Sequence, residues 1–499
     1  MFKKIISLII IAAFMTALFA CAQSGNDGSG SSKDPDTAAI AEDTTKQDGT
    51  TIYYEPDGLS DSLDFKGESV YVLTALENDL TVEGLTSEPV NDSIYNREQY
   101  VEDRLGVEIE EKLTGGDYTN VIRLQINSDE DTYSIYAYNG YMLSNFIFDG
   151  YYKDLYEIEN LDLSKPWWSQ KFNDEIEIED SLYLATGSIT LSLLRNLFAV
   201  YFNKKAADNY TNAYPELSDL YGVVERGEWT FDKFVELGGD IYEDLNGSQT
   251  ADADDFYGIN YLKFITLDAI WSGFDLDVLS KDDDGWFEMN VNTDKLFSAL
   301  DKLYNLMYNV KGCTAGAHIM SEYKEVGPMF ASGQNLFMVG MLGLAEEPEI
   351  RNMTDDYGIL PFPKYDTAQK DYYSYSYDEY RVFAIPITNS KPEIAGAVLE
   401  AMASYSYRNT VPTYLDMVLK GKYMSDASSR RTVDTLVDGF MLDAAWVYID
   451  SLSEQYTPNF RYMIRDGETS WAADHQKKLS LIKFKLKTYK EMYEKNNKK

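Results

Sequence analysis

The chain offers few of the side chains that usually carry catalysis. It has two histidines, His318 and His475, and two cysteines, Cys21 and Cys313. It contains no P-loop, dinucleotide-binding glycine motif, nucleophile elbow or zinc-binding histidine pair. We therefore expect no catalytic centre built on histidine or cysteine. Pairs of carboxylates remain open as a source of chemistry, because 83 acidic residues bring many pairs together by chance.

Aromatic side chains are the most prominent binding groups, with 40 Tyr, 23 Phe and 7 Trp. Aromatic planes stack on the C–H faces of sugar rings, whose hydroxyls need fixed polar partners. Arg195 and Arg381 stand out because basic residues are scarce, and a guanidinium can donate forked hydrogen bonds to hydroxyls or to an acidic sugar. The alternatives are burial of the aromatics in the core and surface ion pairing of the arginines.

One acidic stretch spaces its oxygens like a calcium-binding loop. Its side chains are Asp244, Asn246, Ser248, Thr250 and Asp252, with Asp255 at the twelfth place. Calcium prefers oxygen ligands, and loops of the EF-hand kind have glycine at the sixth place and usually a glutamate at the twelfth. Gln249 holds the sixth place here, and an aspartate is shorter than a glutamate. A calcium site and a plain acidic turn are the alternatives, and we favour the turn.

The overall charge excludes some classes of partner. The chain has 44 basic and 83 acidic residues, which gives a formal net charge of -39. Non-specific nucleic-acid binding needs Lys and Arg to neutralise phosphates, so we expect no nucleic-acid partner. Broad adhesion to an anionic membrane face is disfavoured for the same reason.

The N-terminus has the pattern of a lipoprotein signal. Lys3 and Lys4 precede an apolar run over 5–19, which is too short for a comfortable membrane span. The run leads into Leu-Phe-Ala-Cys, which resembles the bacterial lipobox, and the next stretch is rich in Gly, Ser, Asp and Thr. We predict a signal peptide over 1–20, lipidation of Cys21 at the extracellular face of the cell membrane, and a flexible tether over 21–64. An uncleaved anchor and an ordinary secretory signal are the alternatives.

Strand-type and helix-type patterns alternate along the rest of the chain, which predicts an α/β fold. The expected strands or extended segments are 70–73, 107–113, 133–138, 198–202, 336–339, 357–363 and 382–387. The expected helices are 92–105, 117–126, 229–242, 294–308, 392–406 and 471–493. Gly106 should end the first helix, and the last should dock through an apolar stripe.

Several short strings, in this order along the chain, resemble the large family 1-type extracellular solute-binding proteins of Firmicutes, which are lipoproteins of ABC importers. The strings are 167–173, 182–187, 200–205, 227–234, 244–247 with 257–259, 360–364 and 399–402. The resemblance covers about residues 65–450 and implies a two-lobed, periplasmic-binding-protein-like (type II) fold with a hinge and a ligand cleft. Mapped onto this chain, it places 65–190 and 320–385 in the N-terminal lobe, and 191–319 and 386–499 in the C-terminal lobe.

The same resemblance implies which loops face the cleft. It places there the loops after Tyr136, around Trp167 and Trp168, near Trp271, and around Tyr380. Together with the two arginines, the expected ligand contacts are Tyr138, Tyr141, Trp168, Arg195, Trp271, Tyr380 and Arg381.

The favoured interpretation is a substrate-binding protein, without a cofactor, that delivers a carbohydrate to membrane permease subunits; of a mono- or an oligosaccharide we favour the oligosaccharide. One alternative is an extracellular carbohydrate-active enzyme with paired carboxylates. Others are a structural surface lipoprotein and a binding protein for a peptide or another solute.

Overall fold

The computed structural model describes residues 44–45, 51–52, 56–74, 80–320, 322–420 and 427–497. Residues 40–499 form one compact unit, and the description below concerns that unit. The predicted signal peptide and Cys21 lie outside the described residues. None of the described helices is long and apolar enough to cross a membrane.

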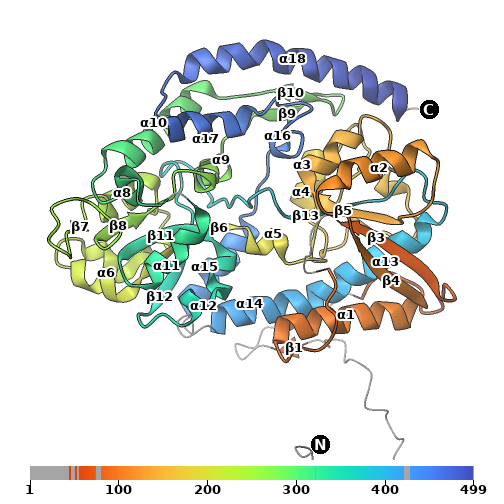
Figure 1. The fold of residues 1–499 in the computed structure, drawn as a ribbon, viewed down its shortest axis with the longest axis horizontal. Helices are drawn as coiled ribbons and strands as arrows, with labels where there is room; N and C mark the ends of the chain where they lie inside the picture. The colour runs from red at the N-terminus through yellow and green to blue at the C-terminus, as the bar shows by residue number, and fades with distance from the viewer. Residues whose placement is uncertain are drawn as a thin grey trace, which may run out of the picture. The chain divides into compact units, whose positions relative to one another are not determined.

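The first of two main sheets has a mixed, mostly parallel arrangement. Its strand order is β13 (Arg381–Ala384), β5 (Ile135–Asn139), β3 (Glu68–Thr74) and β4 (Val107–Leu113). β3 runs parallel to β4 and β5, and β13 is antiparallel to β5. Helix α1 (Pro89–Leu105) ends at Gly106, whose φ of 62° gives the left-handed cap that the sequence predicted. Helix α13 (Pro392–Tyr405) packs beside α1 (Figure 1).

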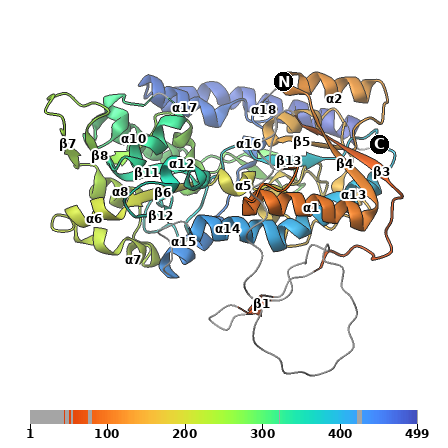
Figure 2. The same cartoon turned by 60° about the horizontal axis from the view of Figure 1, so that its bottom comes forward.

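The second sheet is buried on both faces. Its order is β12 (Tyr357–Pro361), β6 (Phe198–Asn203), β11 (Asn335–Met341), β8 (Phe256–Asn260) and β7 (Tyr242–Glu243). Every residue of β6, β8, β11 and β12 is buried, as expected where helices cover both faces. Figure 2 shows α10 (Thr293–Asn309) on the side of α17 (Tyr456–Asp466), opposite α6 (Lys204–Tyr210), α7 (Leu220–Glu225) and α15 (Ala427–Asp438).

Shorter elements complete the unit. The hairpin strands are β1 (Thr44–Thr45) with β2 (Thr51–Ile52), and β9 (Leu279–Lys281) with β10 (Phe287–Met289). The remaining α-helices are α2 (Tyr118–Asn127), α3 (Gly140–Leu143), α4 (Gln170–Ile176), α5 (Ser192–Arg195), α8 (Phe231–Gly238), α9 (Ile270–Gly273), α11 (Val326–Ala331), α12 (Pro348–Arg351), α14 (Val411–Lys420), α16 (Ala444–Val447) and α18 (Trp471–Asn496).

Three of the segments that carry the chain between the two sheets are hydrogen-bonded to one another, and we call 185–197, 374–381 and 439–443 the crossing segments. The first two pair in antiparallel fashion: the Tyr377 N–H donates to the Asn196 carbonyl at 2.9 Å, and the Phe198 N–H to the Tyr375 carbonyl at 2.9 Å. The third joins them, because the Ser374 N–H donates to the Gly439 carbonyl at 2.8 Å. The crossing segments therefore form one hydrogen-bonded junction.

Helix α18 contacts the layers of both sheets. Near its start the Trp471 indole N–H donates to Asp301 of α10 at 2.8 Å. Near its end the Tyr493 hydroxyl donates to the Ile178 carbonyl at 3.2 Å, and Asn496 donates to the Phe148 carbonyl at 2.9 Å. Figure 1 shows the helix passing along both sets of elements. The predicted apolar stripe thus docks on protein, and Tyr493 is 2% exposed.

The sheet pairing corrects the predicted lobe boundaries. Residues 320–385 were expected in the N-terminal lobe, yet β11 and β12 within that range both pair with β6 of the second sheet, and only β13 joins the first. Residues 386–499 were expected in the C-terminal lobe, yet α13 packs on α1. The strand patterns are visible in the sequence, but partners in a sheet are set by long-range packing, which a periodicity does not encode.

The globular unit also begins before residue 65, which corrects the end of the predicted tether. Asp57 and Leu59 are buried, at 7% and 8% exposed. The Arg104 guanidinium forms an ion pair with Asp57 and also donates to the Leu59 carbonyl at 3.3 Å. This contact holds the segment before β3 against the last turn of α1.

Breaking the Asp57–Arg104 pair should destabilise the fold more than breaking an exposed pair. Arg104→Met leaves the Asp57 carboxylate buried without its cation, so we expect a loss of about 2–4 kcal/mol in the free energy of unfolding. Arg226→Met, at an exposed pair with Asp219, is the matched control and should cost less than about 1 kcal/mol. Denaturant unfolding measures both, and equal losses would contradict a structural role for the Asp57 contact.

Candidate functional site

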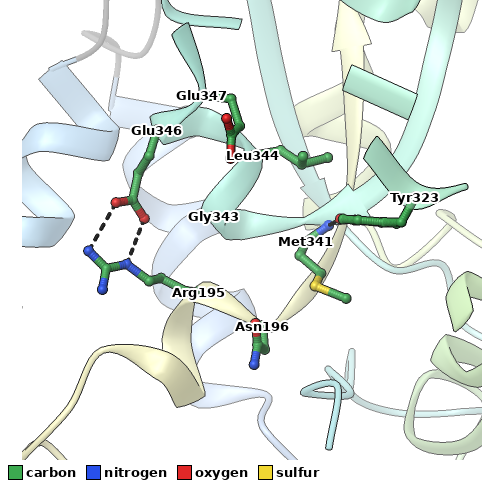
Figure 3. Close-up of a pocket in the computed structure, with 8 residues that line it drawn as sticks. All are labelled: Arg195, Asn196, Tyr323, Met341, Gly343, Leu344, Glu346 and Glu347. Atoms are coloured by element: carbon green, nitrogen blue, oxygen red, sulfur yellow. Dashed lines mark hydrogen bonds and ion pairs between the residues drawn. The ribbon is translucent and has the colours of Figure 1, made fainter. Parts of the chain in front are cut away.

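A cavity of about 280 Å³ with both polar and apolar lining residues lies at the carboxyl end of β11, the sheet edge at which open α/β folds usually bind ligands. β11 ends at Met341, whose N–H donates to the Tyr323 hydroxyl at 2.6 Å, and the chain then enters the 3-10 turn η8 (Leu342–Glu346). The Leu342 N–H donates to the Leu197 carbonyl at 2.8 Å, which brings η8 against α5. The lining residues are Arg195, Asn196, Tyr323, Met341, Gly343, Leu344, Glu346 and Glu347 (Figure 3).

A forked ion pair forms one wall of this cavity. Arg195 donates from Nε and Nη2 to the two Glu346 oxygens at 2.9 and 3.0 Å (Figure 3). Its guanidinium also lies 5.5 Å from the ring centroid of Tyr414 on α14. Bidentate geometry fixes a guanidinium in its own plane. Arg195 therefore presents an oriented rather than a freely moving donor to the cavity.

A second polar group continues from the cavity along the crossing segments, and we call Asp268, Tyr375, Tyr377, Asp378 and Arg461 the junction cluster. Asn196 of the cavity accepts the backbone hydrogen bond of Tyr377, so cavity and cluster are adjacent. Asp268 forms an ion pair with Arg461 of α17, and their side chains are 1% and 10% exposed. The Arg461 guanidinium lies 5.1 Å from the ring centroid of Phe264.

Charge in the junction cluster is poorly solvated. Burial raises the pKa of Asp378 to about 6, the Arg461 guanidinium opposes the shift, and the Glu379 carboxylate adds to it. Burial also raises the pKa of Asp268 above the usual aspartate range, against the effect of its partner Arg461. The cluster thus holds carboxylates that would gain from a further donor or positive charge.

Several buried polar atoms of this region lack a protein partner. They are the Tyr375 hydroxyl, the Trp446 indole N–H, Asp268 Oδ1 and Arg461 Nε. The Tyr375 and Trp446 rings lie 5.0 Å apart, and Asp268 and Arg461 both act electrostatically on Tyr375. Buried polar groups are normally hydrogen-bonded, so this set indicates a place for water or for ligand hydroxyls.

Three of the predicted ligand contacts, Tyr138, Tyr141 and Arg381, meet at the carboxyl end of β5. Arg381 donates to Asn139 Oδ1 at 2.8 Å, and its guanidinium lies 5.6 Å from the Tyr138 ring centroid. Asn139 in turn donates to the Tyr141 hydroxyl at 3.4 Å. Burial raises the pKa of Tyr141, and the Asp378 carboxylate adds to that shift, so this edge lies close to the junction cluster.

Three other predicted contacts are core residues. Trp168 is 2% exposed and its indole N–H donates to Glu400 at 3.0 Å. Trp271 packs edge-on against Trp446, and Tyr380 packs edge-on against Phe172 and Phe440. These environments contradict the expectation of cleft exposure for Trp168, Trp271 and Tyr380, because large aromatics contribute most when buried. Trp271 does form part of the lining of a separate cavity of about 320 Å³ beside α10.

The calcium-like loop satisfies its carboxylates internally. Asp244 accepts the N–H groups of Gly247, Ser248 and Gln249 at 2.7, 3.1 and 2.8 Å. Asp252 accepts from Asn246 and Ser248, and Asp255 accepts from the Tyr242 hydroxyl at 2.8 Å. Within the described residues no group of three or more His, Cys, Asp or Glu side chains is arranged to hold a metal ion. In the structure the stretch forms an acidic turn whose carboxylates accept hydrogen bonds from within and beside the loop.

Sequence reasoning missed nine polar residues of the cavity and the junction cluster. They are Asn196, Asp268, Tyr323, Glu346, Glu347, Tyr375, Tyr377, Asp378 and Arg461. A Tyr-rich run over 372–380 contains Tyr375, Tyr377 and Asp378 and is a local signal of an aromatic, polar site. The other six come from five segments far apart in the sequence, so only the folded structure reveals that they belong together.

Comparison with known proteins identifies the fold. No protein-family model matches the sequence, and no curated protein matches it. The structure is similar to an ABC substrate-binding protein of Listeria monocytogenes solved with cycloalternan, at a TM-score of 0.51 and 13% identity, covering 87% of this chain and 99% of that one. The GacH receptor of Streptomyces glaucescens, solved unliganded and with acarbose, gives 0.52 and 11%, covering 86% and 99%.

A third similar structure is the galacto-N-biose/lacto-N-biose I-binding protein of Bifidobacterium longum, at a TM-score of 0.51 and 12% identity, covering 86% of this chain and 98% of that one. At such identities the likeness shows the fold. It confirms the predicted two-lobed, periplasmic-binding-protein-like α/β class.

Removing the Asp378 charge should change how stability depends on pH. A carboxyl whose folded pKa of about 6 exceeds the unfolded value of 3.8 binds its proton more tightly in the folded state, so its contribution to stability falls as pH rises from 4 to 7. Relative to wild type, Asp378→Asn should therefore gain about 1–2 kcal/mol over that range, after allowance for partial solvent screening. Chemical unfolding of both proteins at pH 4 and pH 7 measures the difference, and a constant difference would contradict the shift.

Proposed function

We propose that this chain is the carbohydrate-binding component of an ABC importer and binds an oligosaccharide between its two sheets. The observation that carries the proposal is the cavity of about 280 Å³ beside the crossing segments, at the carboxyl end of β11, which polar and apolar side chains line together. The proteins of similar fold that were solved with cycloalternan, acarbose or lacto-N-biose support a saccharide ligand.

The groups at the junction suit a polyhydroxylated ligand. Asn196 and Arg195 on one sheet edge, and Tyr141 and Arg381 on the other, offer donors and acceptors in fixed positions. The rings of Tyr138 and Phe264 lie beside arginines at these edges, where they supply partly exposed aromatic planes. Such a combination of ring faces and oriented polar groups is typical of sugar sites.

The proposed mechanism is a shift between open and closed arrangements of the two lobes. A ligand that contacts both sheet edges only when the lobes are closed favours the closed state by the energy of those extra contacts. Permease subunits would then bind the closed form. Anchoring through a lipidated Cys21, with the protein at the outer face of the cell membrane, is part of the same proposal and rests on the N-terminal sequence pattern.

A saccharide panel tests the proposal. We expect one class of neutral or charged oligosaccharide to raise the melting temperature of the full chain in a concentration-dependent way, since a ligand that binds only the folded state adds stability. Product analysis of the same mixtures should find intact saccharide. Release of smaller sugars would instead support the enzyme with paired carboxylates, and a panel without any response would contradict carbohydrate binding.

A substitution in the cavity tests the location of the site. Asn196→Ala should weaken binding of the responding saccharide by about tenfold, the effect of losing a hydrogen bond of about 1 kcal/mol or slightly more. Asn120→Ala is the matched control, because Asn120 is exposed on α2 and bonds only to Asp117. Titration calorimetry measures both affinities, and unchanged binding by Asn196→Ala would place the ligand elsewhere.

A further inference from the structure

A second cavity, of about 320 Å³, lies outside the site described above, and we call it the α9–α10 cavity. Its walls come from α9 and the loop that follows it, from the segment between β10 and α10, and from the first turn of α10 (Figure 1). It shares no lining residue with the cavity at β11. A ligand bound in it would therefore touch a separate set of side chains.

Hydrogen bonds and one ion pair hold the walls of the α9–α10 cavity in place. The Leu276 N–H donates to the Trp271 carbonyl at 2.8 Å, which closes a turn after α9. Lys295, in the first turn of α10, donates to the Asp275 carbonyl at 2.7 Å, and its ammonium lies 3.6 Å from Asp275 Oδ2. The pair joins the loop after α9 to the start of α10, so the shape of the cavity is set by the fold.

The Trp271 indole N–H supplies a donor without a partner. The Trp271 ring is 3% exposed and packs against Trp446, Tyr456 and Phe460. Its N–H donates to no acceptor among the described residues, yet it is not one of the buried polar atoms that are closed off from solvent. Since Trp271 lines the α9–α10 cavity and is otherwise covered by protein, this N–H faces the cavity.

Two further side chains leave hydrogen-bonding groups free at the exposed rim of the same cavity. The Asp277 carboxylate and the Asn290 side-chain amide have neither a hydrogen bond nor an ion pair among the described residues. Partial burial raises the pKa of Asp277, the Asp275 carboxylate adds to the shift, and the Lys295 ammonium opposes it. The Asp277 carboxylate is thus incompletely solvated and would gain from a further donor.

The free groups of the α9–α10 cavity match the hydroxyls of a sugar ring. A hydroxyl both donates and accepts, so neighbouring hydroxyls can bond to the Trp271 N–H, the Asp277 carboxylate and the Asn290 amide. The buried side chains of Leu276 and Leu296 line the same space and offer an apolar surface to the C–H groups of such a ring.

Neither a cation nor an anion satisfies all of these groups. A cation offers no acceptor to the Trp271 N–H and would lie near the Lys295 ammonium, which also lines the cavity. An anion would meet the Asp277 carboxylate. The volume of about 320 Å³ is near the lower end of the roughly 300–1,000 Å³ of ligand sites, which suits one ring rather than a chain of them.

We infer that the α9–α10 cavity is a second saccharide site, which binds a single neutral sugar ring independently of the cavity at β11. In this site the Asp277 carboxylate accepts hydrogen bonds from hydroxyls, the Trp271 N–H donates to one, and the Asn290 amide does both. The inference goes beyond the proposed function, which concerns an oligosaccharide between the two sheets.

Nuclear magnetic resonance of the full chain, isotope-labelled at the tryptophan indole nitrogens, tests the inference. The probes are glucose, galactose, mannose and xylose, because each is a single neutral ring. At least one should shift the Trp271 indole resonance in a saturable way, with a Kd in the millimolar range expected for so small a ligand. Trp271→Phe, which keeps an aromatic ring against Trp446, assigns that resonance. No saturable shift with any of the four sugars would overturn the inference.

Charged probes test the ligand class. Spermidine and glucuronate are titrated in the same way, and neither should shift the Trp271 resonance as strongly as the best neutral sugar does. A saturable shift with either of them, in the absence of a response to the neutral sugars, would overturn the assignment of a neutral ring.

Two charge-removing variants test the location. Asp277→Ala should weaken binding of the responding sugar at least about tenfold, because it removes a charged acceptor. The matched control is Asp283→Ala, which removes the same charge from the exposed turn of the β9–β10 hairpin, outside the cavity lining, and should bind as wild type does. Titration calorimetry gives both Kd values without the resonance assignment, and melting temperatures confirm that both variants are folded. Equal affinities of the two variants would overturn the site.

Asn196→Ala separates the inference from the proposed function. This variant should keep the full response of Trp271 to the monosaccharide. A response that disappears in Asn196→Ala would originate at the cavity at β11, which would overturn the second site and leave the proposed function standing. A response of Trp271 in a chain that binds no oligosaccharide would support the second site and contradict the proposed function alone.

Discussion

The backbone pairing of the crossing segments is the constraint on which the rest of the structure depends. Each sheet has its own strands, but 185–197 and 374–381 run side by side between them, and this pairing places the junction cluster next to the cavity. Their hydrogen bonds set the register between Asn196 of the cavity and Tyr377 beside Asp378. A shift of one residue would turn these side chains to the opposite face, because neighbouring residues in extended chains alternate in direction. The placement of the polar groups therefore follows from main-chain geometry.

Polar groups at the junction are held in position before any ligand arrives. Arg195 is fixed by Glu346 and Arg461 by Asp268, so the lost side-chain freedom is a cost of folding rather than of binding. The same arrangement leaves Asp378 in surroundings that solvate its charge poorly. Sites that bind polar ligands commonly keep such unfavourable charges, since the ligand relieves them.

The sequence predicted single strands and helices better than it predicted which strands pair in a sheet. The strand over Val107–Leu113 and the helix stop at Gly106 were predicted because apolar alternation and a left-handed glycine are local signals. The antiparallel pairing of β11 with β6 was not predicted, because it depends on contacts between residues more than 130 positions apart. The same distinction separates the site residues. Tyr141 and Arg381, which were predicted as ligand contacts, lie near the end of β5 and at the start of β13. Trp168 and Trp271 are buried, because residue type alone does not tell a core ring from a cleft ring.

The long last helix has a mechanical consequence for the movement of the two sheets. α18 has 26 residues, which corresponds to a rod of roughly 39 Å, and its ends are bonded to Asp301 on one side and to Ile178 and Phe148 on the other. A helix bends more readily than it stretches, because stretching breaks a whole ladder of backbone hydrogen bonds. The distance between its two attachment points is thus nearly constant. The two sheets therefore cannot move apart along the axis of α18. The movement that remains available to them is a rotation about this helix.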